Sequence, residues 1–438
     1  MMRASRREVL KFGVAALLGA GLAGACRRRL DRPHVLLMTL DTTRADRLGC
    51  YGYSGATSPS IDMLASESVL FTHAIAPSSW TLPSHASLFT GKFPQSHGAG
   101  YDAEGSLRIT DAIAGPAEWT QYRVRGLAEK EATLAALLKG AGYRTGAVVG
   151  GPWMKRIFGL AGGFDYFDDD GIDSVKGRRA EAVTTRAVGF VERAREEPFL
   201  LFLNYFDPHA PYAPPQPFVR PGDQVHALYE GEIRYMDYHI GRFFERLKAL
   251  DLYDRTFIVV TADHGELLGE HGKLGHGDDL YQEELHVPFL LKYPYGETSA
   301  RTTDAWVQLV DVLPLILERL GLGKPPSVQG GVPPRIGHPV FAEVSPLPFF
   351  GGGGNWRALF HFDYKYLWNS KGNHLLFNLK DDPAERENLL TREPERARSM
   401  DAVLARYANA LPREEDGGPP RAIDEETLRT LRSLGYVR

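Results

Sequence analysis

The stretch His34-Val35-Leu36-Leu37-Met38-Thr39-Leu40, followed at once by Asp41, is the part of this sequence that decides its fold. Residues 198–203 and 256–261 form two more apolar runs, which lead into Asp207-Pro208-His209 and Asp263-His264. Apolar runs that do not alternate with polar residues are typical of strands buried on both faces of a parallel sheet. Weaker runs of the same kind lie at 145–149 and 286–291.

Helical patterns lie between these runs. Ser58-Pro59 begins one helix with proline at its first position, and a second pattern repeats at helical spacing through Ile233, Met236, Ile240, Phe244 and Leu247. Strands that alternate with helices predict a doubly wound α/β domain. Ligands of such domains bind outside the carboxyl ends of the strands. The polar residues at those ends are Asp41, Asp207, His209, Asp263 and His264.

The sequence changes character after about residue 355. Short aromatic segments at 356–362, 365–369 and 374–379 are separated by turn residues, which predicts an antiparallel meander. Leu428, Leu431 and Leu434 then predict a final amphipathic helix. We therefore expect a catalytic domain over residues 33–345 and a C-terminal subdomain over residues 346–438.

Composition excludes several classes of protein. Of 438 residues, 43% are hydrophobic and 24% are charged, which matches a soluble globular protein and not a collagen or a multi-span membrane protein. The formal net charge of -4 is too balanced for a protein that coats nucleic acid, so we expect no nucleic-acid partner. Only Cys26 and Cys50 are present, which rules out a disulfide framework and a cysteine-rich zinc site.

The first 25 residues have the pattern of a Tat-type signal peptide. Arg6-Arg7 forms a twin-arginine pair, and the apolar stretch at 12–25 that follows is short for a membrane span. The end of the segment can be read as a small-residue cleavage site or as a loose lipoprotein signal that leaves Cys26 lipidated. An uncleaved anchor is the third alternative. We expect an exported protein, either periplasmic or held at a membrane by a lipidated Cys26.

Two features suggest the chemistry. Asp41, Asp263 and His264 are ligands suited to one divalent cation, although a capped turn explains an Asp-His pair after a strand equally well. Thr81 stands just before a helix that contains Pro83 and ends at Gly91. A hydroxyl there faces free amide groups and the positive end of the helix dipole, a natural place for an oxyanion or phosphate. An ordinary N-cap is the alternative role for Thr81.

Five ordered segments together resemble the sulfatase family of the alkaline phosphatase superfamily, from about residue 33 to the C-terminus. They lie at 40–52, 81–91, 207–212, 262–266 and 434–437. The resemblance implies an α/β sandwich with a mixed central sheet, followed by a smaller antiparallel sheet and a terminal helix. It also implies hydrolysis of a sulfate or phosphate ester through a covalent intermediate on a metal-bound hydroxyl.

The resemblance implies roles for individual residues. The metal ligands match Asp41, Thr81, Asp263 and His264, which would hold one divalent ion, Ca, Mn, Mg or Zn, with a second ion not excluded. The catalytic positions match Thr81 as nucleophile, with His209 and His276 contacting the transferred group and protonating the leaving oxygen. The candidate substrate-binding residues are Arg44, His85 and Lys273.

The departures from the family pattern matter as much. Thr42 replaces a second metal-binding aspartate, and His85 replaces an arginine of the signature. The family's formylglycine is made from Cys or Ser, and Thr81 is neither. Threonine is the nucleophile in phosphodiesterases and phospho-transferases of the superfamily, so Thr81 favours attack on phosphorus. Ser84 is the alternative modified residue, although it would lie on the helix and not ahead of it.

We therefore expect a metal-dependent hydrolase of small or glycan-borne sulfate or phosphate esters, with phosphoester and phosphonate chemistry favoured. Three alternatives remain: a sulfatase that acts without formylglycine, a transferase of phosphate-linked groups, and a non-catalytic glycan-binding relative. The oligomeric state is not indicated by the sequence.

Overall fold

An eight-stranded sheet forms the centre of the molecule, with the order β13-β2-β12-β9-β1-β8-β6-β7. The computed structural model describes residues 32–172, 174–219, 221, 224–334, 337–348, 353–413 and 429. The strands of the sheet are β1 (His34–Leu40), β2 (Val69–Ile75), β6 (Arg144–Val148), β7 (Tyr166–Asp168), β8 (Phe199–Tyr205), β9 (Thr256–Thr261), β12 (Phe289–Lys292) and β13 (Arg301–Gln308).

The three strong apolar runs form the middle of this sheet, as predicted. Strand β1 lies between β9 and β8 and is parallel to both, and every residue of the three strands is buried. The weaker run at 145–149 is β6, parallel to β8. The run at 286–291 differs, because β12 is antiparallel to β9 and β2 and begins only after Pro288, which has no N–H for a strand ladder. The central sheet is therefore mixed, as the resemblance implied.

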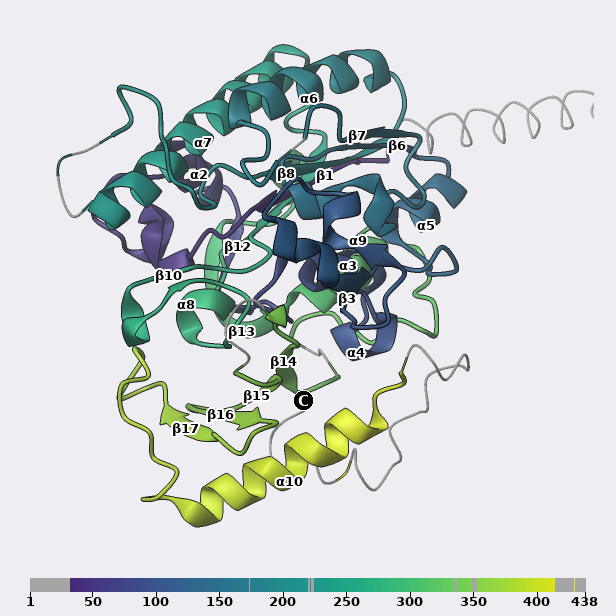
Figure 1. The fold of residues 1–438 in the computed structure, drawn as a ribbon. Coiled ribbons are helices and arrows are strands. Elements are labelled where there is room, and N and C mark those ends of the chain that lie inside the picture. The colour runs from purple at the N-terminus through teal and green to yellow at the C-terminus, as the bar shows by residue number, and fades with distance from the viewer. Residues whose placement is uncertain are drawn as a thin grey trace, which may run out of the picture.

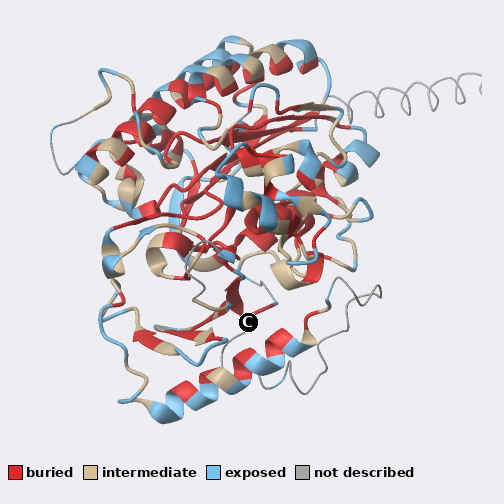
Figure 2. Ribbon diagram, in the orientation of Figure 1, coloured by how far each residue is buried: buried red, intermediate tan, exposed pale blue. Residues whose placement is uncertain are grey.

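Helices cover both faces of the sheet (Figure 1). One layer holds α2 (Pro59–Ala65), α6 (Ala180–Ala194) and α7 (Gln224–Ala249), and the other holds α3 (Thr81–Thr90), α5 (Leu134–Gly140) and α9 (Val312–Arg319). Buried residues are concentrated in the sheet and on the inward sides of these helices (Figure 2). The predicted helix with proline at its first position is α2. The second predicted helical pattern is α7, and all five residues of that pattern are buried.

Short elements lie in the connections between these strands and helices. They are β3 (Gly100–Tyr101), β4 (Leu107–Arg108), β5 (Arg123–Arg125), β10 (Leu267–Leu268), β11 (Leu274–Gly275), α4 (Pro94–His97) and α8 (Gln282–Leu285). Among the residues that the structure describes, no helix has both the length and the apolarity needed to cross a membrane.

The C-terminal part is a four-stranded antiparallel sheet with one helix packed on it (Figure 1). The strands are β14 (Val340–Val344), β15 (Trp356–His361), β16 (Tyr364–Asn369) and β17 (Leu375–Asn378), and the helix is α10 (Pro394–Ala410). The predicted meander is confirmed, and β14 extends it into the segment that we assigned to the catalytic domain. The sequence analysis missed α10. The predicted signal peptide, Cys26 and the predicted terminal helix at 428–434 lie outside the described residues, except for position 429.

Candidate active site

The register of the central strands brings the predicted metal ligands together. Thr39 on β1 pairs with Thr261 on β9 and with Asn204 on β8. Asp41 lies two residues after Thr39, and Asp263 lies two residues after Thr261. Because Thr39 and Thr261 are paired, the two aspartates leave the sheet side by side. The backbone N–H of Thr42 ties the two ends by donating to Asp263 Oδ1 over 3.2 Å. The candidate site therefore lies at the carboxyl edge of the sheet, where doubly wound α/β domains bind their ligands.

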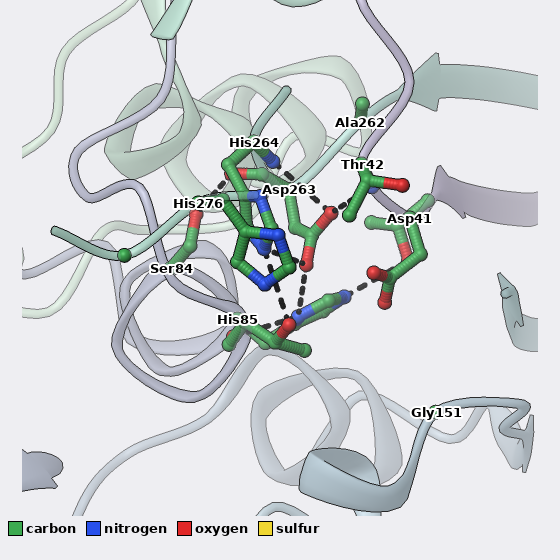
Figure 3. A network of polar contacts seen from close by, with 12 residues as sticks. Asp41, Thr42, Ser84, His85, Gly151, Ala262, Asp263, His264 and His276 are labelled. Carbon is green, nitrogen blue, oxygen red and sulfur yellow. Dashed lines mark hydrogen bonds and ion pairs between the residues drawn. The ribbon is translucent and has the colours of Figure 1, made fainter. Parts of the chain in front are cut away.

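Asp41, Asp263 and His264 form a buried cluster that fits a divalent cation. Their ligand atoms all lie within 4.8 Å of one another, and the three side chains point toward one another (Figure 3). Asp41 Oδ1 and Asp263 Oδ2 are buried without a hydrogen-bond partner among the described residues. Burial and the neighbouring Asp263 raise the pKa of Asp41 well above its usual value. A cation would satisfy both oxygens and offset the repulsion of the two carboxylates.

The imidazole of His264 is oriented for metal binding. Its Nδ1 lies 2.9 Å from the carbonyl oxygen of Gly265, a contact that requires an N–H on Nδ1. The lone pair is therefore on Nε2, which lies 3.4 Å from Asp263 Oδ2 and 3.1 Å from Thr81 Oγ1. A backbone carbonyl that fixes the tautomer of a metal-binding histidine is a common arrangement around metal sites.

Thr81 is the first residue of α3, and its hydroxyl faces the cluster. The N-cap position belongs to Trp80, which makes no side-chain cap, so Thr81 does not act as the ordinary N-cap that was the alternative. Its hydroxyl instead donates to His264 Nε2. Ser84, one turn later, donates to the backbone oxygen of Asp263 over 2.5 Å. The hydroxyl at the N-terminus of the helix is thus beside the metal ligands, where the dipole favours negative charge.

A chain of hydrogen bonds lies beneath the cluster and fixes its geometry. Asn204 Nδ2 donates to Asp41 Oδ2 and to Thr39 Oγ1, both over 3.2 Å. Thr39 Oγ1 contacts His85 Nε2 over 2.9 Å, and His85 Nδ1 contacts the backbone oxygen of Thr81 over 2.9 Å. His85 is completely buried, and Figure 3 shows it next to Asp263. The chain joins strands β1 and β8 to the helix that carries Thr81.

His276 lies beside His264, and His209 lies beside His276. The ring of His276 is 4.4 Å from the ring of His264 and 4.9 Å from the ring of His209. His276 Nδ1 is 2.7 Å from Glu266 Oε1, and the Tyr212 hydroxyl donates to Glu266 Oε2 over 2.9 Å. Burial lowers the pKa of His276 to about 4, and burial together with His276 lowers the pKa of His209 to about 4. Both rings are therefore neutral near pH 7.

The three predicted substrate-binding side chains are engaged with protein groups. Both ring nitrogens of His85 are bonded within the chain described above. Arg44 pairs with Asp46 and Glu270, each over 2.8 Å, and Lys273 pairs with Asp278 and Asp279. Of the three, only His85 has its whole hydrogen-bonding capacity used within the protein. Their substrate-binding roles stay predictions.

Sequence reasoning missed the residues that support the ligands. Asn204 follows the predicted strand at 198–203, at the same edge of the sheet as the predicted metal ligands. That position could have indicated its role. Glu266 lies in the 262–266 segment of the resemblance, but its contact with His276 crosses a loop, so no local pattern predicted its role. Thr42 adopts a left-handed backbone with φ of 53°, which is unusual for a β-branched residue and brings its N–H onto Asp263.

A second group of possible ligands lies away from the cluster. It consists of His271, Glu283 and Glu385, whose ligand atoms also lie within 4.8 Å of one another. His271 and Glu283 approach to 3.5 Å, and Lys365 lies 2.8 Å from Glu385. A histidine–carboxylate pair and a lysine–carboxylate pair explain these contacts without an ion, so they do not support the second ion that the sequence analysis left open.

The fold and the cluster together define an ester-bond hydrolase of the alkaline-phosphatase-like class. The family model described as Sulfatase matches residues 33–322, and the chain belongs to the sulfatase family. The uncharacterized sulfatase YidJ of Escherichia coli (strain K12) is 24% identical over 441 aligned positions, covering 82% of this chain and 84% of YidJ.

Two solved structures share the fold. The phosphonate monoester hydrolase of Agrobacterium radiobacter superposes with a TM-score of 0.70 at 20% identity, covering 86% of this chain and 96% of that chain. A protein solved in complex with its substrate D-glucosamine-2-N,6-O-disulfate gives a TM-score of 0.70 at 18% identity, covering 89% of this chain and 99% of that chain. The chain is thus a sulfatase-like hydrolase, and its fold is shared with a phosphonate monoester hydrolase.

Proposed function

We propose that the enzyme cleaves phosphodiesters or phosphonate monoesters in preference to sulfate esters, through a covalent intermediate on Thr81. The observation that carries the proposal is the position of the Thr81 hydroxyl, 3.1 Å from His264 Nε2 at the N-terminus of α3. A threonine at this position cannot supply formylglycine, which is made from Cys or Ser. A threonine ester of phosphorus can be hydrolysed by water, whereas a sulfothreonine lacks the hemiacetal route that regenerates formylglycine.

The reaction is balanced as two displacements at phosphorus. In the first, Thr81 Oγ1 gives its proton to solvent and forms a bond to phosphorus, while the bond from phosphorus to the leaving oxygen breaks and that oxygen takes a proton from His276 or His209. In the second, water attacks phosphorus and the bond to Thr81 Oγ1 breaks, which restores the hydroxyl. Asp41, Asp263 and His264 would hold a divalent ion, which would neutralise charge and lower the pKa of the Thr81 hydroxyl.

His276 and His209 are the proposed partners of the leaving oxygen. Their rings are adjacent to His264, and the Glu266 carboxylate lies 2.7 Å from His276 Nδ1. A carboxylate in that position stabilises the protonated imidazole, which then gives a proton to the leaving oxygen. Because burial keeps both rings neutral near pH 7, this step requires that the bound anionic substrate raise the pKa of the ring that gives the proton.

We further propose that the substrate is a small or glycan-borne ester and that the protein is exported. The glycan assignment is supported by the structural neighbour whose substrate is a disulfated glucosamine. Export, and attachment through Cys26, rest on the twin-arginine pattern of the first 25 residues. A sulfatase without formylglycine is the second candidate function, favoured by the family of the chain.

The test is a parallel assay of the purified enzyme with Mn²⁺, Ca²⁺, Mg²⁺ or Zn²⁺ on an aryl phosphodiester, an aryl phosphonate monoester and an aryl sulfate. We expect the highest kcat/KM on a phosphorus ester, and a loss of about 10³-fold or more for Thr81→Ala. Ser84→Ala is the matched control, expected within about tenfold of wild type because its hydroxyl contacts a backbone oxygen.

Rapid quenching followed by mass spectrometry should detect a phosphorylated peptide containing Thr81. Full activity of Thr81→Ala would overturn the nucleophile assignment. Fastest turnover of the aryl sulfate would favour the sulfatase candidate instead.

A further inference from the structure

The short helix α8 is hydrogen-bonded to both segments that carry the pair His276 and Glu266. The backbone oxygen of Glu283 accepts from the N–H of Glu266 over 3.0 Å, and Glu284 Oε1 accepts from the N–H of Gly277 over 3.1 Å. Gly277 directly follows His276 in the chain. Two consecutive residues of one helix therefore hold the backbone on both sides of the contact between the two side chains.

The approach of α8 to the segment at 264–266 is close. Gly265 donates its backbone N–H to the backbone oxygen of Glu284 over 2.7 Å. A Cβ atom on Gly265 would lie 2.0 Å from the backbone oxygen of Glu283, so this approach requires glycine. Because Gly265 directly follows His264, the segment that carries this candidate metal ligand is held at a fixed position against α8.

The Glu284 side chain is completely buried, and the mechanism proposed above does not use it. Carboxyl groups are rarely buried unless hydrogen bonds compensate for the lost hydration. The donors here are two backbone N–H groups, that of Gly277 to Oε1 and that of Tyr281 to Oε2 over 3.4 Å. Burial and the neighbouring Asp279 raise the pKa of Glu284 well above its usual value, which favours the neutral carboxyl.

The turn after His276 depends on this acceptor. Gly277 is buried and has a left-handed backbone with φ of 88°. A buried N–H without an acceptor is unfavourable, so the turn would shift toward water if the Glu284 carboxyl were removed. Such a shift would move His276 relative to Glu266, and the contact of 2.7 Å between their side chains would be lost.

The C-terminal subdomain holds the start of α8 (Figure 1). Glu385 Oε2 accepts from the N–H of Gln282, the first residue of the helix, over 2.6 Å. Glu385 Oε1 lies 2.8 Å from Nζ of Lys365 on β16, and both side chains are completely buried. The helix is thus fixed to the C-terminal sheet by one end and contacts the active-site loops through Glu283 and Glu284.

We infer that Glu284 is a positioning residue for leaving-group protonation, because it holds the turn at 276–277 so that His276 stays against Glu266. The inference rests on the proposed role of His276 as a proton donor and deepens it. Glu284 acts through His276 and has no contact with the reacting atoms of its own.

The test compares kcat on a phenyl ester and a 4-nitrophenyl ester, both of the ester class that wild type hydrolyses fastest. A phenolate leaving group needs a proton more than 4-nitrophenolate does. We expect Glu284→Ala to lower kcat about tenfold on the phenyl ester and to leave the 4-nitrophenyl ester unchanged, because only part of the general acid effect is lost. Glu284→Gln keeps an acceptor oxygen for Gly277 and should restore the wild-type ratio of the two rates.

The matched control is Asp237→Ala, which removes another buried carboxyl that accepts two backbone N–H groups. Asp237 accepts from Ser60 and Ile61, each over 2.9 Å, at the start of α2. This variant should keep the wild-type ratio. Glu284→Met, which fills most of the buried volume without an acceptor, is measured beside Glu284→Ala, and turnover of the 4-nitrophenyl ester shows that each variant is folded.

A double variant tests whether Glu284 acts through His276. We expect His276→Gln to show a selective loss on the phenyl ester, and the addition of Glu284→Ala to cause no further loss. An unchanged ratio in Glu284→Ala, an equal loss on both esters, or a fully additive loss in the double variant would overturn the inference alone. An unchanged ratio in His276→Gln would overturn the proposed role of His276, and the inference with it.

Discussion

The side-chain amide of Asn204 donates to Asp41 Oδ2 over 3.2 Å, and its carbonyl oxygen accepts from the backbone N–H groups of Gly150 and Gly151 over 3.2 and 2.8 Å. One buried amide thus joins Asp41, a predicted metal ligand that follows β1, to the loop after β6. Since Gly150 and Gly151 hold the oxygen of the amide, the nitrogen must face Asp41. Asn204 therefore fixes the orientation of the Asp41 carboxylate.

Asn204→Ala should weaken metal affinity by about 10–100-fold, the usual cost of losing a partner of a metal ligand. The measurement is the metal concentration that restores half of the activity after chelation. Asn378→Ala, whose amide contacts Asp381 in the C-terminal sheet, is the control and should show wild-type affinity. Equal affinity in wild type and Asn204→Ala would remove this orienting role.

Glu266→Gln should separate leaving-group protonation from the rest of the reaction. The amide keeps the shape of the carboxylate but cannot stabilise a protonated His276. We expect a fall of about 100-fold in kcat for esters of alkyl alcohols, in the range that general acid catalysis contributes, and little change for 4-nitrophenyl esters, whose leaving group needs no proton. The measurement is the dependence of kcat on the pKa of the leaving group.

Tyr212→Phe is the control for this prediction, because it removes the hydroxyl contact to Glu266 Oε2 and keeps the carboxylate. It should leave the dependence on the leaving group close to that of wild type. A uniform loss of activity across all leaving groups in Glu266→Gln would mean that Glu266 has only a structural role.

Asp41→Asn should have opposite effects on the metal-free and metal-bound proteins. Burial and Asp263 raise the pKa of Asp41, so the folded state prefers the neutral carboxyl. In the metal-free wild type, this group therefore lowers stability as pH rises above its unfolded value of about 3.9. At pH 8 with a chelator, we expect Asp41→Asn to melt about 2 °C or more above wild type, which corresponds to about 1 kcal/mol.

With the activating metal, the order should reverse. A ligand at 100 times its Kd adds about 2.7 kcal/mol to the stability of the protein that binds it, and Asp41→Asn should lose most of this gain. Differential scanning fluorimetry with and without the ion measures both effects. If the ion raised the melting temperatures of wild type and variant equally, Asp41 would not be a ligand.

Much of the fold followed from the sequence because the apolar runs are local signals. The stretch at 34–40 does not alternate apolar with polar residues, a pattern typical of a strand covered on both faces, and His34 and Thr39 are buried with the rest. The direction of β12 could not be predicted, because the same run of residues 289–292 suits either orientation and only the long-range connection selects one. Helix α10 did have a signal in Met400, Val403, Leu404 and Tyr407, which lie at helical spacing and are buried.

The residues of the site that directly follow neighbouring strands could be predicted from the sequence, because the pairing of the strands brings them together. Asp263 and His264 follow one strand and Asp41 follows its neighbour, so the strand register alone brings them together. Arg44 shows the limit, since it is adjacent to the ligands in the chain but pairs with Glu270, more than two hundred residues away. Such a pairing depends on the fold of the loop around η7 (Glu270–Gly272), which no local pattern specifies.

His338 and Asp311 form a buried pair that should make stability depend on pH. His338 Nε2 lies 2.7 Å from Asp311 Oδ1, and Nδ1 lies 2.8 Å from the backbone oxygen of Pro339. Both contacts use an N–H, so they favour the doubly protonated ring. Although burial lowers the pKa of His338, the charge and hydrogen bond of Asp311 raise it above its usual value. The pair links the segment before β14 to the start of α9.

A histidine whose folded pKa is raised contributes its full stability below the unfolded pKa of about 6.5, and loses it as pH rises through the folded value. We expect wild type to exceed His338→Gln in free energy of unfolding by about 1.5 kcal/mol or more at pH 6, the size of a hydrogen bond to a charged group. The difference should shrink steadily toward pH 9. Urea unfolding of both proteins at pH 6, 7.5 and 9 measures it, and a difference that stays constant or grows with pH would show that His338 is neutral in the folded protein.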